Sequence, residues 1–425
     1  MKSIRELFDF GYFTKKGLIL FYAYMAIYVL YAFTTGLEDI LLALSIGVFI
    51  IAPLGASFLM FVFYLLWEYE TTFSFGVTVV LIMQLLMVAK ILMMGKLQIK
   101  CINRVQNRTN TLQTILLIYV LVMGVASLAL TGNMTGIGMA FKAIITFYVI
   151  SYLKDDESYI KVLKAIFHAL FFSTIIATIY GFFHDTALER WVSGLGEVSQ
   201  LYGTLGTTSM GFFYIISMAY FLYFVESKII RYAGIAVFSL LTFMTVSLTA
   251  VALYLVVIAL YFFSLGKIRK TITYFVIGIF ALFITFPIWS RLDVVEPILL
   301  RATFATEAYE QGDANLALSG REDLGTSYMK KFENSNTFAK LFGNADEAVS
   351  VVGAEKVAHN TYIDILFYFG IFGLVLFALY HFRRFTLIVK KPYFYPLLTM
   401  KAVLLLGAFT VSIMSATYFF FLIFV

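Results

Sequence analysis

A histidine, an asparagine and a tyrosine stand together at the start of the last long apolar segment, in the stretch HNTYIDILFYFGIFG at residues 359–373. An imidazole with an ordinary pKa can take a proton from a hydroxyl group near neutral pH. If the stretch forms one continuous helix, His359, Tyr362, Gly370 and Gly373 fall within an arc of about 80°. We therefore expect a polar helix end above two glycines that let another helix approach closely. A helix-start histidine above ordinary packing glycines is the alternative interpretation.

A second group of candidate residues lies in the longest polar segment, residues 290–358, within the sequence ALSGREDLGTSYMKKFE. Ser319 followed by Glu322 is a capping-box pattern, which predicts a helix start. Arg321 would then lie in the first turn, beside free N–H groups and the positive dipole end, where a phosphate can bind. An ordinary capped helix with a solvated arginine would give the same pattern. The helix would carry an apolar stripe of Leu324, Tyr328 and Phe332, suited to a membrane surface or to the helix bundle.

Two ionisable residues lie inside apolar segments instead of between them. Lys142 falls near the middle of one segment, in GMAFKAIITF, and His168 falls at a similar depth in the next. A lysine inside a membrane is costly, so it is expected to line a cavity or to have a partner. Roughly 16 Å of helix separates Lys142 from the segment end, which is far for a snorkelling side chain. His168 can stay neutral with a backbone carbonyl as its partner.

The composition indicates a membrane protein. Hydrophobic residues make up 61% of the chain and charged residues 13%, and the mean hydropathy is +0.91. These values, with continuous apolar runs, predict an all-α polytopic membrane protein and argue against a β-barrel, whose strands alternate. The net charge of +6 comes from basic residues between the apolar runs, so it does not indicate nucleic-acid binding. The single cysteine, Cys101, excludes an intramolecular disulfide.

The positions of basic residues predict the topology of the chain. The loop KLQIKCINRVQNR, which ends at Arg108, carries four positive charges and is placed inside. Alternation then places residues 290–358 outside, as one large loop that carries short helices within a single transmembrane domain, 1–425. The run at 38–66 is interrupted by Pro53, so we split it into two spans. About 12 to 14 transmembrane helices are expected. They lie near 17–36, 38–66 (two), 73–95, 111–131, 134–153, 159–183, 206–225, 229–247, 248–265, 271–289, 359–380 and 397–425 (one or two).

Three short motifs taken together resemble the bacterial O-antigen polymerase and ligase superfamily. They are GR at 320–321, LFGN at 341–344 and HN at 359–360, and the spacing of His-Asn, nine residues, Gly, two residues, Gly looks like the ligase-family motif. The resemblance covers about residues 135–375. One departure concerns a Ser-Arg pair that the family often has where a middle span ends. Here the corresponding stretch, TVSLTAVAL at 245–253, contains no arginine.

The resemblance implies a metal-independent glycosyltransferase that acts at the outer face of the bacterial cytoplasmic membrane. Such a polymerase transfers a glycan from undecaprenyl diphosphate onto a lipid-linked repeat unit and so builds an O-antigen, a capsule or an exopolysaccharide. A diphosphate leaving group needs fixed positive charge, and an acceptor hydroxyl needs a base. On this basis His359 is the catalytic candidate, and the substrate-binding candidates are Arg321, Lys142, Arg190, Asn360 and Tyr362.

The same resemblance implies the partners and leaves alternatives open. We expect undecaprenyl-diphosphate-linked oligosaccharides, the lipid bilayer, a chain-length regulator and a flippase as partners, and no metal, cofactor or nucleic acid. One alternative is a ligase that delivers finished glycan to a lipid or protein acceptor. An alternative of another class is a transporter or flippase, which predicts paired charges at the membrane middle and broken helices in repeated halves. The chain instead concentrates its polar signals in one asymmetric external loop.

Overall fold

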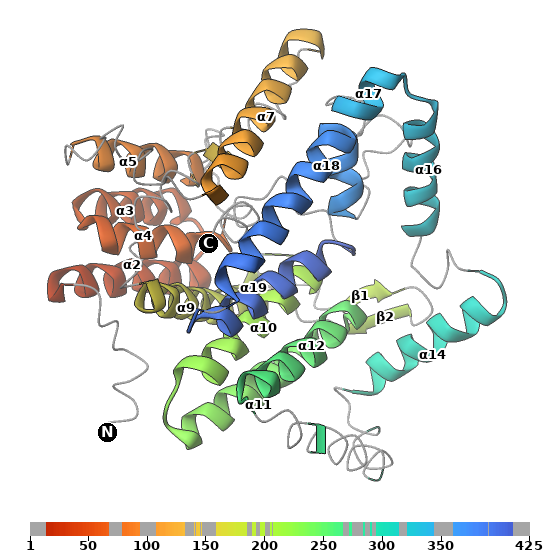
Figure 1. The fold of residues 1–425 in the computed structure, drawn as a ribbon. Helices are drawn as coiled ribbons and strands as arrows, with labels where there is room; N and C mark the ends of the chain where they lie inside the picture. The colour runs from red at the N-terminus through yellow and green to blue at the C-terminus, as the bar shows by residue number, and fades with distance from the viewer. Residues whose placement is uncertain are drawn as a thin grey trace. The chain divides into compact units, whose positions relative to one another are not determined.

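In the part of the chain that the computed structural model describes, the elements are α-helices and one short β-hairpin (Figure 1). Among these, α2 (Lys15–Phe33), α9 (Tyr159–His184), α10 (Thr207–Phe224) and α18 (Thr361–Ile388) are long and apolar enough to cross a membrane. The total of about 12 to 14 spans stays a prediction. The described residues are 14–67, 79–93, 108–131, 140, 142–144, 146, 159–184, 189–192, 196–199, 205, 207–266, 272–273, 284, 290, 295–313, 321–343, 360–389 and 391–410.

The chain divides into two compact units, each of which draws on several separate segments. In the first, the run at 38–66 forms two helices, α3 (Glu38–Ile51) and α4 (Leu54–Tyr64), as predicted. Pro53 separates them, since proline has no N–H group to continue the helix ladder. The rings of Tyr28 in α2 and Phe63 in α4 lie 5.3 Å apart, and the indole N–H of Trp67 donates to Ser173 of α9. Buried aromatic packing therefore holds these helices together.

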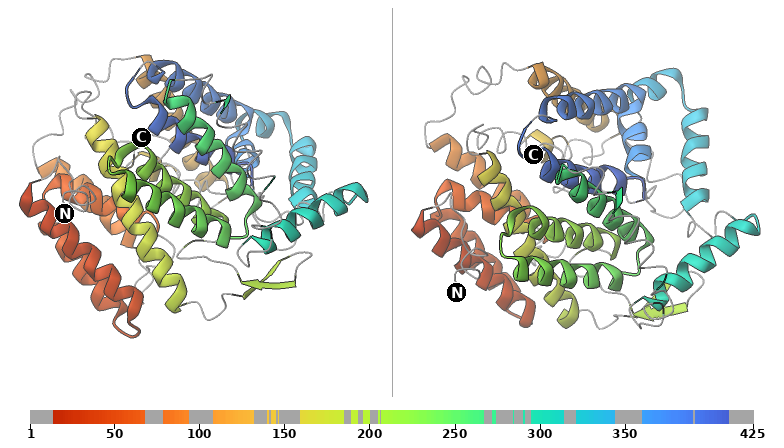
Figure 2. Two further views of the ribbon diagram at one scale, coloured as in Figure 1. Left: turned by 90° about the horizontal axis from the view of Figure 1, so that it is seen from below. Right: turned by 60° about the horizontal axis from the view of Figure 1, so that its bottom comes forward.

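Three helices of the first unit match predicted segments closely. They are α10, α11 (Lys228–Met244) and α12 (Leu248–Ser264), which Figure 2 shows in green. Glycines let them approach one another: a methyl group at Gly211 would lie 2.6 Å from Cβ of Ala250. His168 of α9 is buried and its Nδ1 lies 2.9 Å from the hydroxyl of Tyr220. The tyrosine hydroxyl thus takes the place of the backbone carbonyl expected for this histidine.

Beside its helices, the first unit contains one short β-hairpin. Strands β1 (Glu189–Val192) and β2 (Gly196–Ser199) form an antiparallel pair, with Arg190 opposite Val198. The segment between the spans predicted at 159–183 and 206–225 therefore contains a hairpin. The first unit also includes α14 (Glu296–Glu310) of the large polar segment, which has Pro297 in its first turn.

The second unit contains the elements that carry the motifs. They are α7 (Arg108–Thr131), α16 (Arg321–Asn334), α17 (Thr337–Phe342), α18 and the turn at 408–410. Asn336 begins α17, because its side chain accepts a hydrogen bond from the N–H of Ala339 at 2.8 Å. The two remaining helices, α5 (Val79–Met93) and α19 (Phe394–Gly407), each contain a boundary between the units.

Candidate functional site

Helix α18 is broken at Gly370 and folds back on itself. Gly370 has φ 65° and ψ −173°, which is not a helical conformation. The rings of Tyr362 and Phe377 lie 6.3 Å apart, whereas a straight helix would separate these positions by about 22 Å. The prediction of one continuous helix with Gly370 on a shared face is therefore wrong. Residues 361–369 form a first arm and residues 371–388 a second arm (Figure 1).

The break is locked by a second glycine, Gly343, at the end of α17. Both glycines have positive φ, 95° at Gly343 and 65° at Gly370. A methyl group on Gly370 would overlap the carbonyl of Leu341, and one on Gly343 would overlap the carbonyl of Tyr368. The two backbones therefore cross where side chains do not fit. This crossing joins the LFGN motif to the glycine motif of α18.

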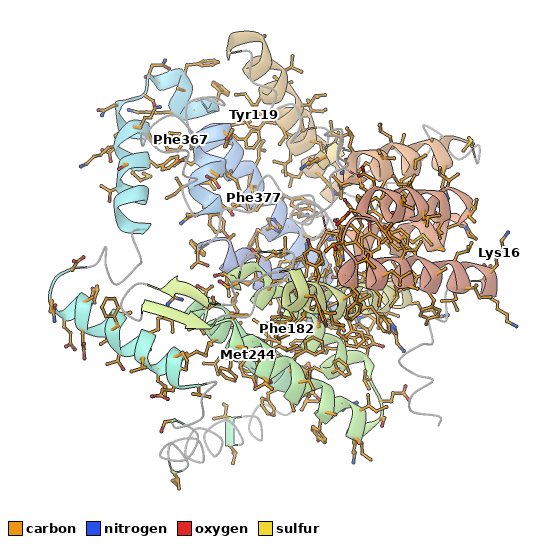
Figure 3. The ribbon with its side chains drawn as sticks, turned by 180° about the vertical axis from the view of Figure 1, so that it is seen from behind. Lys16, Tyr119, Phe182, Met244, Phe367 and Phe377 are labelled. Atoms are coloured by element: carbon orange, nitrogen blue, oxygen red, sulfur yellow. The ribbon has the colours of Figure 1, made fainter. Side chains whose placement is uncertain are left out.

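Tyr119 of α7 closes the crossing from the other side. Its hydroxyl lies 2.6 Å from the carbonyl oxygen of Phe369 and 3.1 Å from that of Phe342, as a donor to both. Both carbonyls lie at helix ends, where the regular ladder leaves acceptors without an N–H group. A methyl group at Gly373 would lie 3.1 Å from the ring of Tyr119, so a neighbouring helix does approach at this glycine as predicted. Figure 3 labels Tyr119 on α7.

Removing the Tyr119 hydroxyl is expected to destabilise the second unit. Tyr119→Phe keeps the ring and leaves two carbonyls short of a donor, which costs about 1–3 kcal/mol. The midpoint of thermal unfolding of the detergent-solubilised protein should fall accordingly. Tyr232→Phe is the matched control, because the side chain of Tyr232 is 65% exposed. Equal midpoints for the two variants would show that the hydroxyl does not hold the crossing.

Helix α16 runs beside the first arm of α18 in the same direction. A methyl group at Gly325 would lie 3.7 Å from Cδ1 of Ile363, and further along, the rings of Tyr328 and Phe367 lie 5.1 Å apart. The two helices are therefore parallel, and their first residues lie at the same end. This arrangement brings the start of α16, at Arg321, near the start of α18, which follows the His-Asn pair.

Two residues of the apolar stripe predicted for α16, Tyr328 and Phe332, pack on α18. Tyr328 is only 1% exposed, and Phe332 also contacts the ring of Phe367, at 6.1 Å. Burial raises the pKa of Tyr328, and the nearby carboxylate of Asp364 raises it further. Asp364 is itself buried in the first turn of α18, a position that suits a negative charge. The sequence analysis missed this carboxylate, although an acidic residue just after a helix start is a recognisable signal.

Asn360 is the N-cap of α18. Its side-chain oxygen accepts from the N–H groups of Tyr362 at 3.0 Å and Ile363 at 3.2 Å, and the N–H of Thr361 donates to the carbonyl of Ala408. The first N–H groups of α18 are therefore already used, and this helix end is not an open anion site. The amide group of Asn360 keeps its two N–H donors, which a sugar hydroxyl can accept.

The structure places the other candidate residues as follows. Arg321 begins α16, but its side chain lies outside the described residues, and so does all of His359. Tyr362 packs against the ring of Phe409 at 4.4 Å. Lys142 is half-buried in a short helical piece of the second unit, whereas Arg190 belongs to the first unit. The starts of α16 and α18 therefore lie at the same end, while the substrate-binding roles of Arg321, Asn360, Tyr362, Lys142 and Arg190 stay predictions.

An arginine does reach the turn where the sequence lacks one. Between α11 and α12, Val246 has φ 49°, a conformation that a β-branched residue rarely adopts. Arg301 of α14 donates to the carbonyl of Val246 at 2.8 Å. Ser247 caps α12 by accepting from the N–H of Ala250. Arg301 could not be assigned to this turn from its sequence position, because it belongs to α14 of the large polar segment and not to the span that ends at the turn.

Comparison with known proteins adds no further constraint. No protein-family model, no curated protein and no solved structure matches the chain. Within the described ranges, no three His, Cys, Asp or Glu side chains gather in a way that would hold a metal ion. The function must therefore be argued from the residues and their geometry.

Proposed function

We propose that the protein is a metal-independent glycosyltransferase that polymerises lipid-linked repeat units into a surface polysaccharide. The parallel arrangement of α16 and the first arm of α18 supports this proposal most strongly. The first residues of these two packed helices, Arg321 of α16 and Thr361 of α18 with its N-cap Asn360, lie at the same end although a large loop separates them in sequence. In the proposal, a cation for a diphosphate at Arg321 and a base for a hydroxyl at His359 act together at this end.

In the proposed reaction, the acceptor hydroxyl oxygen attacks the anomeric carbon of the donor sugar. His359 takes the hydroxyl proton as the new C–O bond forms. The bond from the anomeric carbon to the diphosphate breaks, and undecaprenyl diphosphate leaves with the electron pair and inverted geometry at carbon. Arg321 stabilises the negative charge on the leaving group, with Lys142 as a further candidate. Asn360 and Tyr362 contact the sugar or orient the histidine.

Replacing Arg321 by lysine is expected to lower the rate of transfer by about 10²-fold, the scale of losing one preorganised donor. Lysine keeps the charge but loses the fork that binds two phosphate oxygens at once. The measurement is the rate of extension of lipid-linked oligosaccharides by purified protein. Arg231→Lys is the control, because Arg231 belongs to α11 of the first unit, where it donates to the carbonyl of Val225. Wild-type rates for Arg321→Lys would remove this residue from the site.

One observation favours the transporter alternative: α18 is broken at Gly370, and transporters bind substrates at discontinuous helices. At such breaks, unpaired carbonyl groups coordinate ions or substrate. Here the carbonyl of Phe369 at the break accepts a hydrogen bond from Tyr119, so the protein itself uses this acceptor. The break therefore supports a rigid junction better than an ion site. A ligase would use the same residues with a different acceptor.

A further inference from the structure

Helix α17 exposes two large apolar side chains. Phe338 is 65% exposed and Leu341 is 43% exposed, and their spacing of three residues places them on the same side of the helix. On the other side, Ala339 and Gly343 are buried, and Gly343 lies against the backbone of Tyr368 in α18. One side of α17 thus packs on α18, and the other side faces away from the protein.

The exposed side of α17 continues an apolar stripe on the second arm of α18. The ring of Phe338 lies 5.0 Å from that of Phe342, which contacts Phe372. The stripe continues along α18 at spacings of three and four residues, which keeps it on one side of the helix. Its exposed members are Phe372, Val375, Leu379 and Phe382.

The second arm contains no Asp, Glu, Lys or Arg from residue 371 to residue 382, about 18 Å of helix, and Arg383 and Arg384 follow. A continuous exposed stripe of Phe, Val and Leu along such a helix is what lipid contact requires. At α17 the surroundings become polar: Asn336 and Thr337 are exposed, and Lys340 is half-buried beside them. A lysine at such a boundary can keep its stem on apolar surface and its charge in water.

From this continuity, we propose that α17 lies at the boundary of the bilayer hydrocarbon, with Phe338 and Leu341 in contact with lipid. The crossing at Gly343 and the hydrogen bonds of Tyr119 would then transmit this anchorage to α18. The inference does not depend on which reaction the protein catalyses.

Spin-label accessibility tests this proposal without an activity assay. In a Cys101→Ser background, Phe338→Cys is labelled with a nitroxide and the protein is placed in nanodiscs of phosphatidylcholine and phosphatidylglycerol. Collision rates are measured with oxygen, which concentrates in hydrocarbon, and with a water-soluble nickel chelate. Phe382→Cys is the lipid reference, since Phe382 is 69% exposed on the stripe. Thr326→Cys, on the exposed side of α16, is the water reference.

We expect the oxygen-to-nickel ratio at Phe338 to be several-fold higher than at Thr326 and close to that at Phe382. Leu341→Cys should give the same result, which covers the case in which Phe338→Cys does not fold. A ratio at both positions equal to that at Thr326 would overturn the proposal, and so would a water-like ratio at Phe382. Spin–spin broadening at Phe338 that disappears on dilution with unlabelled protein would also overturn it, because a second copy of the chain would then cover this side.

Discussion

Replacing His359 by alanine is expected to slow glycan transfer by about 10²–10⁴-fold, the usual contribution of a general base. The chain enters α18 immediately after this residue, and Asn360 caps the helix whether or not the imidazole is present. The variant should therefore keep a thermal stability near that of the wild type. The rate of extension of lipid-linked oligosaccharides measures the effect. A folded His359→Ala protein with the wild-type rate would leave only Arg321 and the loop helices to support the site.

Replacing Gly370 by alanine is expected to disrupt the second unit. The residue has φ 65°, and a methyl group there would overlap the carbonyl of Leu341. A φ of 65° with a ψ of −173° is essentially a glycine conformation, which costs another residue about 1–3 kcal/mol, and the overlap costs about 1–3 kcal/mol more. Both folded protein and activity should therefore fall. Thermal unfolding of the detergent-solubilised protein measures the change.

Gly312→Ala is the matched control for this substitution. Gly312 also has a positive φ, 80°, but nothing lies within 4 Å of an added methyl group. The control therefore carries the conformational cost without the overlap. Equal loss of stability in the two variants would mean that the backbones do not cross at Gly343 and Gly370.

Local signals predicted the starts of the key helices well. The Ser319 and Glu322 pattern indicated a helix in the large loop, and α16 begins at Arg321 with Tyr328 and Phe332 packed on α18. Such signals work because helix ends and apolar stripes depend on residues a few positions apart. The separation of α3 from α4 at Pro53 followed from one residue in the same way.

The break in α18 could not be predicted from the sequence, because its cause is distant in the chain. A glycine inside an apolar helix indicates close packing and a break equally well. The break at Gly370 depends on the close approach of Gly343 and on the hydroxyl of Tyr119, and both residues lie in other segments of the chain. Similarly, nothing in the sequence distinguishes Tyr119 from other tyrosines of apolar segments, because its two carbonyl partners belong to α17 and α18.

The hairpin and Arg301 were missed for different reasons. The two strands enclose a short segment rich in glycine and serine, a composition that favours a hairpin turn. This local signal for β1 and β2 was present in the sequence, but no hairpin was predicted from it. Arg301 had none, because its contact with Val246 joins α14 to a turn far earlier in the sequence. A contact of this kind can be identified only from the three-dimensional packing of the helices.

Extension of a lipid-linked oligosaccharide by the purified protein tests the central proposal most directly. The wild-type protein, in detergent or in vesicles, is mixed with undecaprenyl-diphosphate-linked repeat units, and the products are separated by size. Polymerisation predicts a ladder of products that differ by one repeat unit, and His359→Ala should remove the ladder. The contradicting result is an unchanged substrate with the wild-type protein, while the same protein in vesicles moves the lipid-linked oligosaccharide across the bilayer.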